Sequence, residues 1–202
     1  MDALAREGEA HPDFRVVRRL DLSQSVAPLA GAVRRCVIVD TETTGMDLEA
    51  DQVIELGMIA FDYDDSGAVG PVVGSYSAFE DPGRDIPVSS TAIHHITDEM
   101  VAGQRIDDAA VASLLDGVTI TVAHNAGFDR RFLERRLSVF EDLPWASSFY
   151  EVPWAEHDLS SAKLEYLAYR AGFFYEGHRA ENDCRALLEV LRQPLGTTGV
   201  TA

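Results

Sequence analysis

The stretch CVIVDTETTGM, residues 36–46, decides the fold of this 202-residue chain. Its first four residues are small, apolar or β-branched, which is typical of a buried strand. The strand then runs into two carboxylates, Asp40 and Glu42, before a turn at 43–45. Side chains two positions apart on a strand point to the same face, so this pair projects together. An apolar strand that ends on paired acids predicts a functional site at its end.

Two carboxylates this close repel each other, and one of them takes a proton unless a cation lies between them. A hard divalent ion with oxygen ligands is the natural partner for such a pair. On its own, the Asp-x-Glu pattern of Asp40 and Glu42 also fits two ordinary acids at the start of a loop. Features farther along the chain decide between these interpretations.

The segments after the opening strand predict an α/β domain. QVIELGMIAFDY (52–63) and VVGSYSAFE (72–80) have β patterns separated by a DDSG turn, so three neighbouring strands form an antiparallel meander. Helices and strands then alternate, which favours a mixed sheet with helices packed against it. We expect helices at 89–97, 107–115, 128–140, 162–172 and 181–191, and strands at 117–125 and 145–152.

The charge is concentrated in one part of the chain. The net charge is −17, and residues 36–129 hold 18 of the 34 acidic and two of the 17 basic residues. Such a protein is a poor non-specific binder of nucleic acid, whose affinity normally comes from Lys and Arg. Either the acids bind metal cations that reverse the local field, or phosphate contacts come from the Arg-richer second half. Otherwise the acids form a solvated surface.

Apolar runs and the first residues bear on location, and the cysteine spacing bears on metal sites and disulfides. No apolar run approaches the roughly 18–20 residues of a membrane helix, and the first residues lack the pattern of a signal peptide, so we expect a cytoplasmic, membrane-free location. Cys36 and Cys184 lack metal-site spacing and are predicted to be buried. The predicted division is an N-terminal extension (1–34) packed on the domain, a domain at 35–193, and a flexible tail (194–202).

Three further residues strengthen the metal interpretation. Asp129 follows a short apolar strand near the start of a helix, and Asp183 borders the core-facing stripe of the final helix. His178 lies five positions before Asp183, a step that turns about 140° on a continuous helix. With His178 in the loop that enters the helix, both side chains can reach one site.

Three motifs in this order resemble those of the DnaQ-like 3′–5′ exonucleases of the DEDDh type: VDTETTGM (39–46), AHNAGFD (123–129) and HRAENDC (178–184). That family includes the proofreading epsilon subunit of bacterial DNA polymerase III. The likeness runs from about residue 35 to 191 and includes IHHITDEM (93–100). The segments HPDFRVVRRL, WASS and KLEYL further resemble stand-alone bacterial exonucleases of the family.

The resemblance implies a ribonuclease-H-like fold with a five-stranded mixed sheet, and two Mg²⁺ or Mn²⁺ ions. Asp40, Glu42, Asp129 and Asp183 match the family carboxylates, and His178 matches the general base. We expect Asp40 to bridge both ions, with Glu42 and Asp183 on the water-activating ion and Asp129 on the other. An imidazole suits proton transfer near neutral pH.

The resemblance also implies substrate contacts at Thr43, Met46, His94 and Asn125. Met46 matches an apolar wedge beside the terminal base, although a Met also fills core gaps. Asn125 matches a residue near the scissile nucleotide, although Asn is also common where strands turn. His95 departs from the family glycine, which questions how closely this loop approaches substrate.

Several other residues have open interpretations. The arginines at 130, 131, 135 and 136 form either a solvated helix face or a patch that guides phosphates. Lys163, the single lysine, reaches a phosphate or caps a helix. We assign no role to His124 or His157, and we expect Trp145 and Trp154 in the core.

The leading function is a metal-dependent exonuclease that releases nucleoside 5′-monophosphates from 3′ ends, with single-stranded or frayed DNA favoured over RNA. An RNA-trimming enzyme is the alternative of the same class. A third hypothesis is a proofreading or repair module that docks on a polymerase or repair partner, which an exposed apolar patch on the N-terminal extension would favour.

Overall fold

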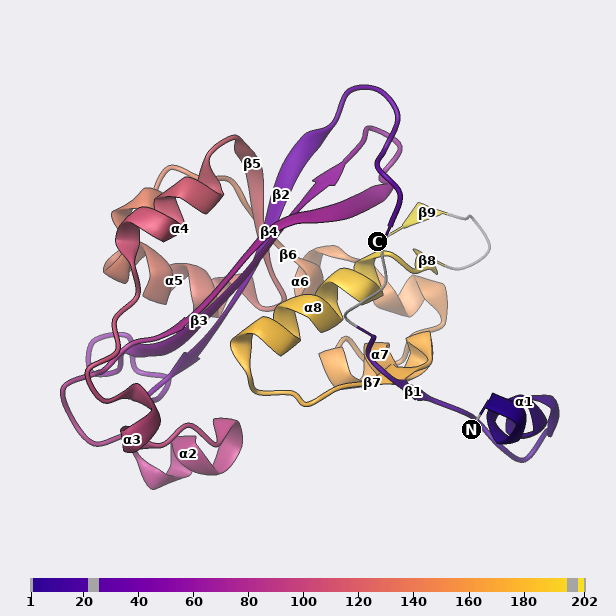
Figure 1. Ribbon diagram of the computed structural model, residues 1–202, viewed down its shortest axis with the longest axis horizontal. Coiled ribbons are helices and arrows are strands. Elements are labelled where there is room, and N and C mark those ends of the chain that lie inside the picture. The colour runs from indigo at the N-terminus through magenta and orange to yellow at the C-terminus, as the bar shows by residue number, and fades with distance from the viewer. Residues whose placement is uncertain (1, 22–25, 196–199, 202) are drawn as a thin grey trace.

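A five-stranded mixed sheet in the order β4-β3-β2-β5-β6 forms the centre of the fold (Figure 1). The computed structural model describes residues 2–21, 26–195 and 200–201. β2, β3 and β4 form the predicted antiparallel meander, whereas β5 lies parallel to both β2 and β6. The strands of this sheet are β2 (Arg34–Thr43), β3 (Val53–Tyr63), β4 (Val69–Phe79), β5 (Val118–Ala123) and β6 (Trp145–Ser147).

Helices follow the sequence patterns, with local chemistry at their ends. The Asp107 side chain accepts hydrogen bonds from two backbone N–H groups at the start of α4, and Gly172 ends α7 in the left-handed conformation at φ 92°. No described helix combines the length and apolar character needed to cross a bilayer. The helices are α1 (Asp2–Ala10), α2 (Val88–His94), α3 (Asp98–Val101), α4 (Asp108–Leu115), α5 (Ala126–Arg136), α6 (Ser148–Glu151), α7 (Leu164–Ala171) and α8 (Ala180–Leu191), with 3₁₀ turns η1 (Ser138–Phe140) and η2 (Trp154–His157).

The two faces of the sheet carry separate cores because side chains alternate along each strand. Val37 and Val39 of β2 join the core under α4 and α5, whereas Cys36 and Ile38 join the core under α7 and α8. Figure 1 shows these helix pairs on opposite sides of the sheet. Asp40 continues the alternation of Cys36 and Ile38, so β2 delivers its carboxylate toward α8.

The predicted burial is confirmed for both cysteines and Trp154, and Trp145 is partly buried. Cys36 and Cys184 are both buried. Trp154 is buried in the core under α7 and α8, and Trp145 packs against the opposite core. Burying a large apolar side chain contributes about 1.5–3 kcal/mol, so these positions stabilise both layers.

The strand predicted at 145–152 is wrong beyond its first three residues. β6 ends at Ser147, and α6 follows at once. Side chains replace the strand hydrogen bonds there: the Ser147 N–H donates to the Glu151 carboxylate, and the Trp154 Nε1–H donates to the Ser148 carbonyl. Because β6 is an edge strand, no second neighbour in the sheet holds the chain extended.

The N-terminal segment contacts the domain through a short strand. β1 (Arg18–Arg19) pairs in parallel with β7 (Phe173–Phe174), and the Arg15 guanidinium donates to carbonyls at the end of α7. At the other end, β8 (Pro194–Leu195) pairs with β9 (Val200–Thr201), while residues 196–199 and 202 of the predicted tail lie outside the described residues. The domain boundaries at 34/35 and 193/194 remain our proposal.

Candidate active site

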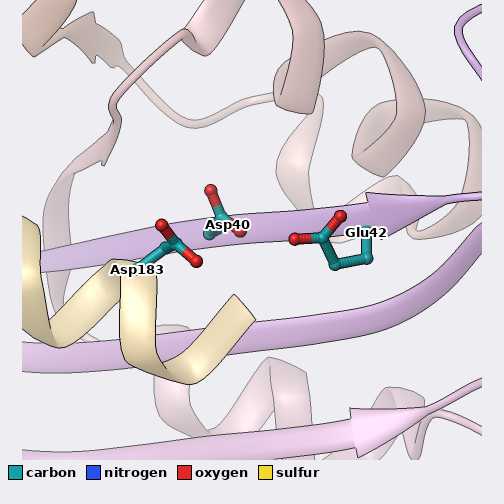
Figure 2. Close-up of side chains that lie close together, drawn as sticks. All are labelled: Asp40, Glu42 and Asp183. Carbon is teal, nitrogen blue, oxygen red and sulfur yellow. The ribbon is translucent and has the colours of Figure 1, made fainter. Parts of the chain in front are cut away.

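Three carboxylates meet where β2 passes the first turns of α8. Ligand atoms of Asp40, Glu42 and Asp183 all lie within 4.8 Å of one another. Figure 2 shows Asp40 and Glu42 projecting from β2 and Asp183 from α8. Alternate residues of β2 point to the face on which α8 packs, so acids about 140 positions apart in the sequence come together. The chemistry of this donor set fits a hard divalent cation.

Asp183 is fixed in place by two hydrogen bonds. The Tyr175 hydroxyl donates to its Oδ1 atom over 3.0 Å, and the Arg179 backbone N–H donates to its Oδ2 atom over 3.1 Å. The second contact also satisfies an N–H group at the start of α8, which otherwise has no partner within the helix. Asp183 therefore serves both the acidic cluster and the end of its own helix.

Asp129 lies beside the three-carboxylate group, at the start of α5. It is 4% exposed, and its Oδ1 atom accepts hydrogen bonds from the backbone N–H and the hydroxyl of Thr41. Thr41 points to the opposite face of β2 from Asp40, so its contact holds α5 against the strand. The fourth predicted carboxylate thus lines the same cavity as the other three.

Burial and mutual repulsion raise the pKa values of all four acids. Burial raises the pKa of Asp40 far above its ordinary range, with the charges of the other acids adding to the shift. Burial and the Asp183 charge raise the pKa of Glu42 to about 8. Burial raises the pKa of Asp129 to about 7 and that of Asp183 to about 6, against the hydrogen bonds that each accepts. Such a cluster favours protons or a bound cation.

His178 lies in the loop before α8, as the sequence predicts. Its backbone has φ 59°, in the left-handed region that favours glycine, and α8 begins two residues later at Ala180. His178 and Asp183 line one cavity, and a charged His178 lowers the pKa of Asp183.

The acids and His178 line a cavity of about 470 Å³. Its size suits a nucleotide-sized ligand, and its walls combine carboxylates, aromatic rings and a lysine. The lining residues are Asp40, Thr41, Glu42, Met46, His124, Asn125, Phe128, Asp129, Phe149, Tyr150, Lys163, Leu164, Glu165, His178 and Asp183.

The four predicted substrate residues divide into two groups. Met46, 85% exposed, and Asn125 line the cavity. The exposure of Met46 excludes the core-gap interpretation. Thr43 and His94 are buried and are absent from the cavity walls within the described part of the chain. His94 accepts a hydrogen bond from the Ile96 N–H at its Nδ1 atom, and burial lowers its pKa.

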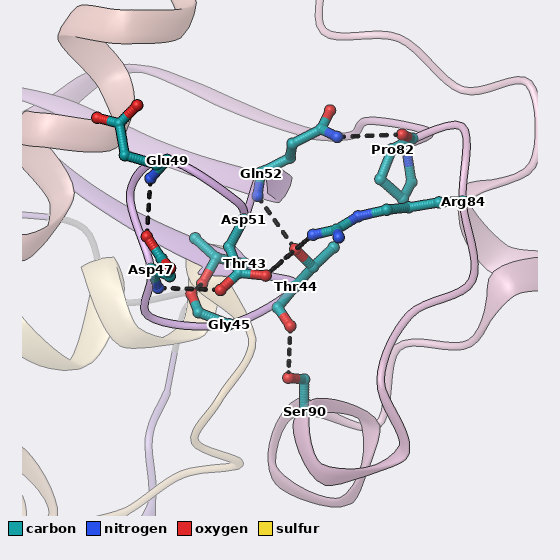
Figure 3. Close-up of polar contacts among 10 residues, drawn as sticks. All are labelled: Thr43, Thr44, Gly45, Asp47, Glu49, Asp51, Gln52, Pro82, Arg84 and Ser90. Atoms are coloured by element: carbon teal, nitrogen blue, oxygen red, sulfur yellow. Dashed lines mark hydrogen bonds and ion pairs between the residues drawn. The ribbon is translucent and has the colours of Figure 1, made fainter.

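Polar contacts hold the loop that carries Met46 (Figure 3). The Asp51 carboxylate accepts hydrogen bonds from the Thr44 hydroxyl and from the Asp47 N–H. The Arg84 guanidinium donates to both Thr44 and Asp51. A Cβ at Gly45 would lie 2.3 Å from an Asp51 oxygen, so this turn requires glycine. The loop is therefore ordered by its own side chains and presents Met46 outward.

Sequence reasoning missed part of the cavity wall. His124, to which we assigned no role, contacts Ser148 through Nδ1 and the Ala162 carbonyl through Nε2. A carbonyl only accepts, so Nε2 carries the hydrogen and Nδ1 accepts from the Ser148 hydroxyl. Lys163 occupies the N-cap position of α7 without a cap hydrogen bond from its side chain, which excludes the capping interpretation.

Further wall residues lie in, or directly after, the segments that resemble stand-alone bacterial exonucleases. Tyr150 and Phe149 follow WASS, and Glu165 lies within KLEYL. The placement of Phe149 and Tyr150 depends on α6 replacing the end of the predicted strand, which no local pattern signals.

The fold and the acidic cavity define a ribonuclease-H-like nuclease domain, and the comparisons identify its family. A family model described as Exonuclease (RNase_T) matches residues 37–191, so the chain belongs to this DnaQ-like exonuclease family. The chain is 31% identical to the DNA polymerase III subunit epsilon of Treponema pallidum over 160 residues, which cover 75% of this chain and 72% of that protein.

Other relatives are longer proteins or solved complexes. The PolC-type DNA polymerase III of Clostridium perfringens is 33% identical over 168 residues, and the chain spans only 11% of its length. Exonuclease X in complex with 5′ overhanging duplex DNA is 26% identical with a TM-score of 0.57, covering 83% of this chain and 95% of that one. The E. coli exonuclease I–ssDNA complex, at 16% identity and a TM-score of 0.59, shares the fold over 79% of this chain and 40% of its own.

Proposed function

We propose that this chain is a metal-dependent 3′–5′ exonuclease of the DEDDh type that releases nucleoside 5′-monophosphates from DNA 3′ ends. The observation that carries the proposal is the meeting of Asp40, Glu42 and Asp183 within 4.8 Å, in one cavity with His178. Membership of the exonuclease family supports the reaction class. The DNA complexes of the solved relatives support DNA as the substrate.

Asp40, Glu42, Asp129 and Asp183 would hold two divalent ions, Mg²⁺ or Mn²⁺. When bound, the ions supply charge neutralisation at the phosphate and stabilise both the attacking and the leaving oxygen. Carboxylates already fixed by hydrogen bonds, such as Asp183 and Asp129, need little reorganisation to bind a cation.

His178 would act as the general base. It takes a proton from the attacking water as the water oxygen bonds to phosphorus, and the bond from phosphorus to the 3′ oxygen of the preceding nucleotide breaks. The released nucleotide keeps its 5′-phosphate, and the leaving oxygen gains a proton from solvent. Met46 would lie against the terminal base, and Asn125 would lie near the scissile nucleotide, since both residues line the cavity.

The test uses the purified chain with 5′-labelled single-stranded DNA, duplex DNA and RNA, with and without EDTA. A one-nucleotide ladder on DNA that EDTA abolishes is the expected result. A ladder on RNA alone would replace the proposal with RNA trimming. Products that do not shorten stepwise from the 3′ end would overturn the polarity.

A second candidate function, docking on a polymerase or repair partner, is favoured by the N-terminal segment. Leu4 and Phe14 are 73% and 66% exposed there, although large apolar side chains normally become buried. The names of the polymerase III relatives make a polymerase catalytic subunit the candidate partner. Leu4→Glu with Phe14→Glu should abolish co-elution with that subunit and leave hydrolysis of free DNA intact; unchanged co-elution would refute docking through this segment.

A further inference from the structure

A buried carboxylate lies behind the acidic cluster, on the strand next to it. Glu55 of β3 is 1% exposed and lies opposite Glu42 in the β2–β3 register. Its oxygens accept hydrogen bonds from Nε and Nη2 of Arg179 at 2.8–3.2 Å and from the Ala180 N–H at 3.0 Å. A buried charge requires such partners, because it loses its hydration.

These contacts hold the chain immediately after a strained residue. His178, at φ 59°, precedes Arg179 directly, and Arg179 also donates its backbone N–H to Asp183. The start of α8 lies on β3 so closely that a Cβ at Gly57 would come within 2.3 Å of the Ala180 carbonyl carbon. A left-handed backbone at a residue other than glycine persists only where its surroundings fix it.

The Arg179 guanidinium is itself held from a second strand. It lies over the Phe79 ring of β4 at 5.3 Å from the ring centre, a cation–π distance. The Nε–H of the planar Arg179 guanidinium donates to both carboxylate oxygens of Glu55, so the orientation of the Arg179 side chain is fixed as well as its charge balanced. The sheet thus fixes the residue that follows His178.

We propose that the Glu55–Arg179 pair is a positioning device that sets the His178 imidazole for proton transfer and acts on the reaction through His178. This inference rests on the proposed function, in which His178 is the general base. Glu55 lies on β3 rather than on the cavity wall, so its effect on the chemical step passes through the loop.

The central test is Glu55→Gln, which keeps an oxygen for the Ala180 N–H and removes the charge that Arg179 requires. We expect kcat to fall about 10- to 100-fold, the size typical of residues that orient site groups. KM for DNA and the Mn²⁺ affinity measured by calorimetry should stay near wild type. Amide hydrogen exchange should accelerate at residues 177–181.

A double-mutant cycle separates positioning from loss of stability. In the His178→Ala background, Glu55→Gln should change kcat less than about twofold, because the residue through which it acts is gone. A full additional loss in that background would overturn the inference. Arg179→Lys keeps the charge without the fork and should reproduce the Glu55→Gln effect; it serves as the test if Glu55→Gln fails to fold.

A matched control pair joins the residue after β4 to α5. Glu80 likewise accepts from Nε and Nη2 of Arg136 and from the Ile106 N–H. Glu80→Gln should lower the thermal midpoint comparably and leave kcat unchanged. An equal loss of kcat in both variants would overturn the positioning role.

Failure of the inference can be told from failure of the proposed function. A wild-type chain without metal-dependent nuclease activity overturns the proposed function, and the inference with it. If the wild-type chain is active but Glu55→Gln has an unchanged kcat, only the inference is overturned. Unaltered amide exchange at residues 177–181 in Glu55→Gln would likewise overturn the inference alone.

Discussion

The side chains of His178 and Asp183 reach the cavity because of the backbone that carries them. The imidazole reaches the cavity because the chain turns through a left-handed residue just before α8, and the carboxylate reaches it from the first turns of that helix. Tyr175 supports Asp183 through its hydroxyl, and burial with the neighbouring negative charges raises the pKa of that phenol. Each of these two proposed catalytic groups is thus held by neighbours to which we assign no part in the reaction.

Substituting His178 should separate chemistry from metal binding. We expect His178→Ala to lower kcat about 10²- to 10⁴-fold, the range for loss of a general base, while Mn²⁺ still binds. Asp183→Asn should abolish both nucleotide release and tight Mn²⁺ binding, with circular dichroism confirming that the fold survives. Near wild-type rates in either variant would contradict the assignment.

The raised pKa values predict how the metal-free protein responds to pH. Glu42 and Asp129 have pKa values of about 8 and 7 when folded, against about 4 when unfolded, so the folded state holds more protons in this window. The free energy of unfolding in EDTA should therefore fall as pH rises from about 4 to 8. Denaturant titrations from pH 4 to 9 measure this.

Mn²⁺ should reverse that loss and release protons on binding, because the carboxylates bind metal in their charged form. Glu42→Gln is the control, and its pH dependence should be shallower than that of wild type. A flat profile for the wild-type chain in EDTA would show that the carboxylates keep ordinary pKa values.

At the scale of elements, the end of α2 and the loop that carries Met46 explain two departures from simple patterns. His95 ends α2 at φ 59°, the conformation for which the resembling motif uses glycine. His95 thus holds a left-handed conformation that costs a residue with a side chain more than it costs glycine. In the loop that carries Met46, the contact between Thr44 and Asp51 orders the chain, so Met46 stays exposed without a core beneath it.

Restoring glycine at position 95 should relieve strain. A left-handed residue other than glycine costs about 1–2 kcal/mol, so His95→Gly should stabilise the fold by about 1 kcal/mol after the added chain entropy. For a chain of this size the thermal midpoint should rise about 2–4 °C. His95→Ala keeps the strain, and a midpoint equal to that of His95→Gly would refute this account.

At the scale of the whole molecule, few basic groups lie where they could meet phosphates: Lys163 lines the acidic cavity, and four arginines lie on α5, the helix that also carries Asp129. Of the four arginines on α5, Arg130 pairs with Glu134 and Arg136 pairs with Glu80 and Asp108. Arg131 and Arg135 are exposed, four positions apart on one helix face. A net charge of −17 makes any remaining cationic contact count in DNA binding.

Removing the two exposed arginines should weaken the salt dependence of DNA binding. Each phosphate contact on single strands contributes about 0.7 to the slope of log K against log salt, so Arg131→Ala with Arg135→Ala should reduce the slope by up to roughly 1.4. Fluorescence anisotropy of the Asp40→Ala variant measures binding without hydrolysis. Arg130→Ala is the matched control, and an unchanged slope in the double variant would show a merely solvated face.

The amino-acid sequence by itself determined the elements and the chemistry of the candidate site. Runs of apolar residues define β2 and β3, and strand parity alone places Asp40 and Glu42 on one face. The ordered motifs indicate the family, which the comparisons establish. Such features are local or follow from fixed residue types, so they can be read along the chain.

Only the tertiary structure decided which distant groups support the site. The α6 helix replaces the end of a predicted strand, and the Glu151 and Trp154 side chains satisfy backbone groups of Ser147 and Ser148 at its start. In the sequence Glu55 is an ordinary strand residue, and its contact with the start of α8 exists only in the folded chain. Lys163 and Tyr150 line the cavity only because of how the helices pack. Side-chain hydrogen bonds and burial between segments far apart in sequence leave no periodic signal, so packing alone reveals them.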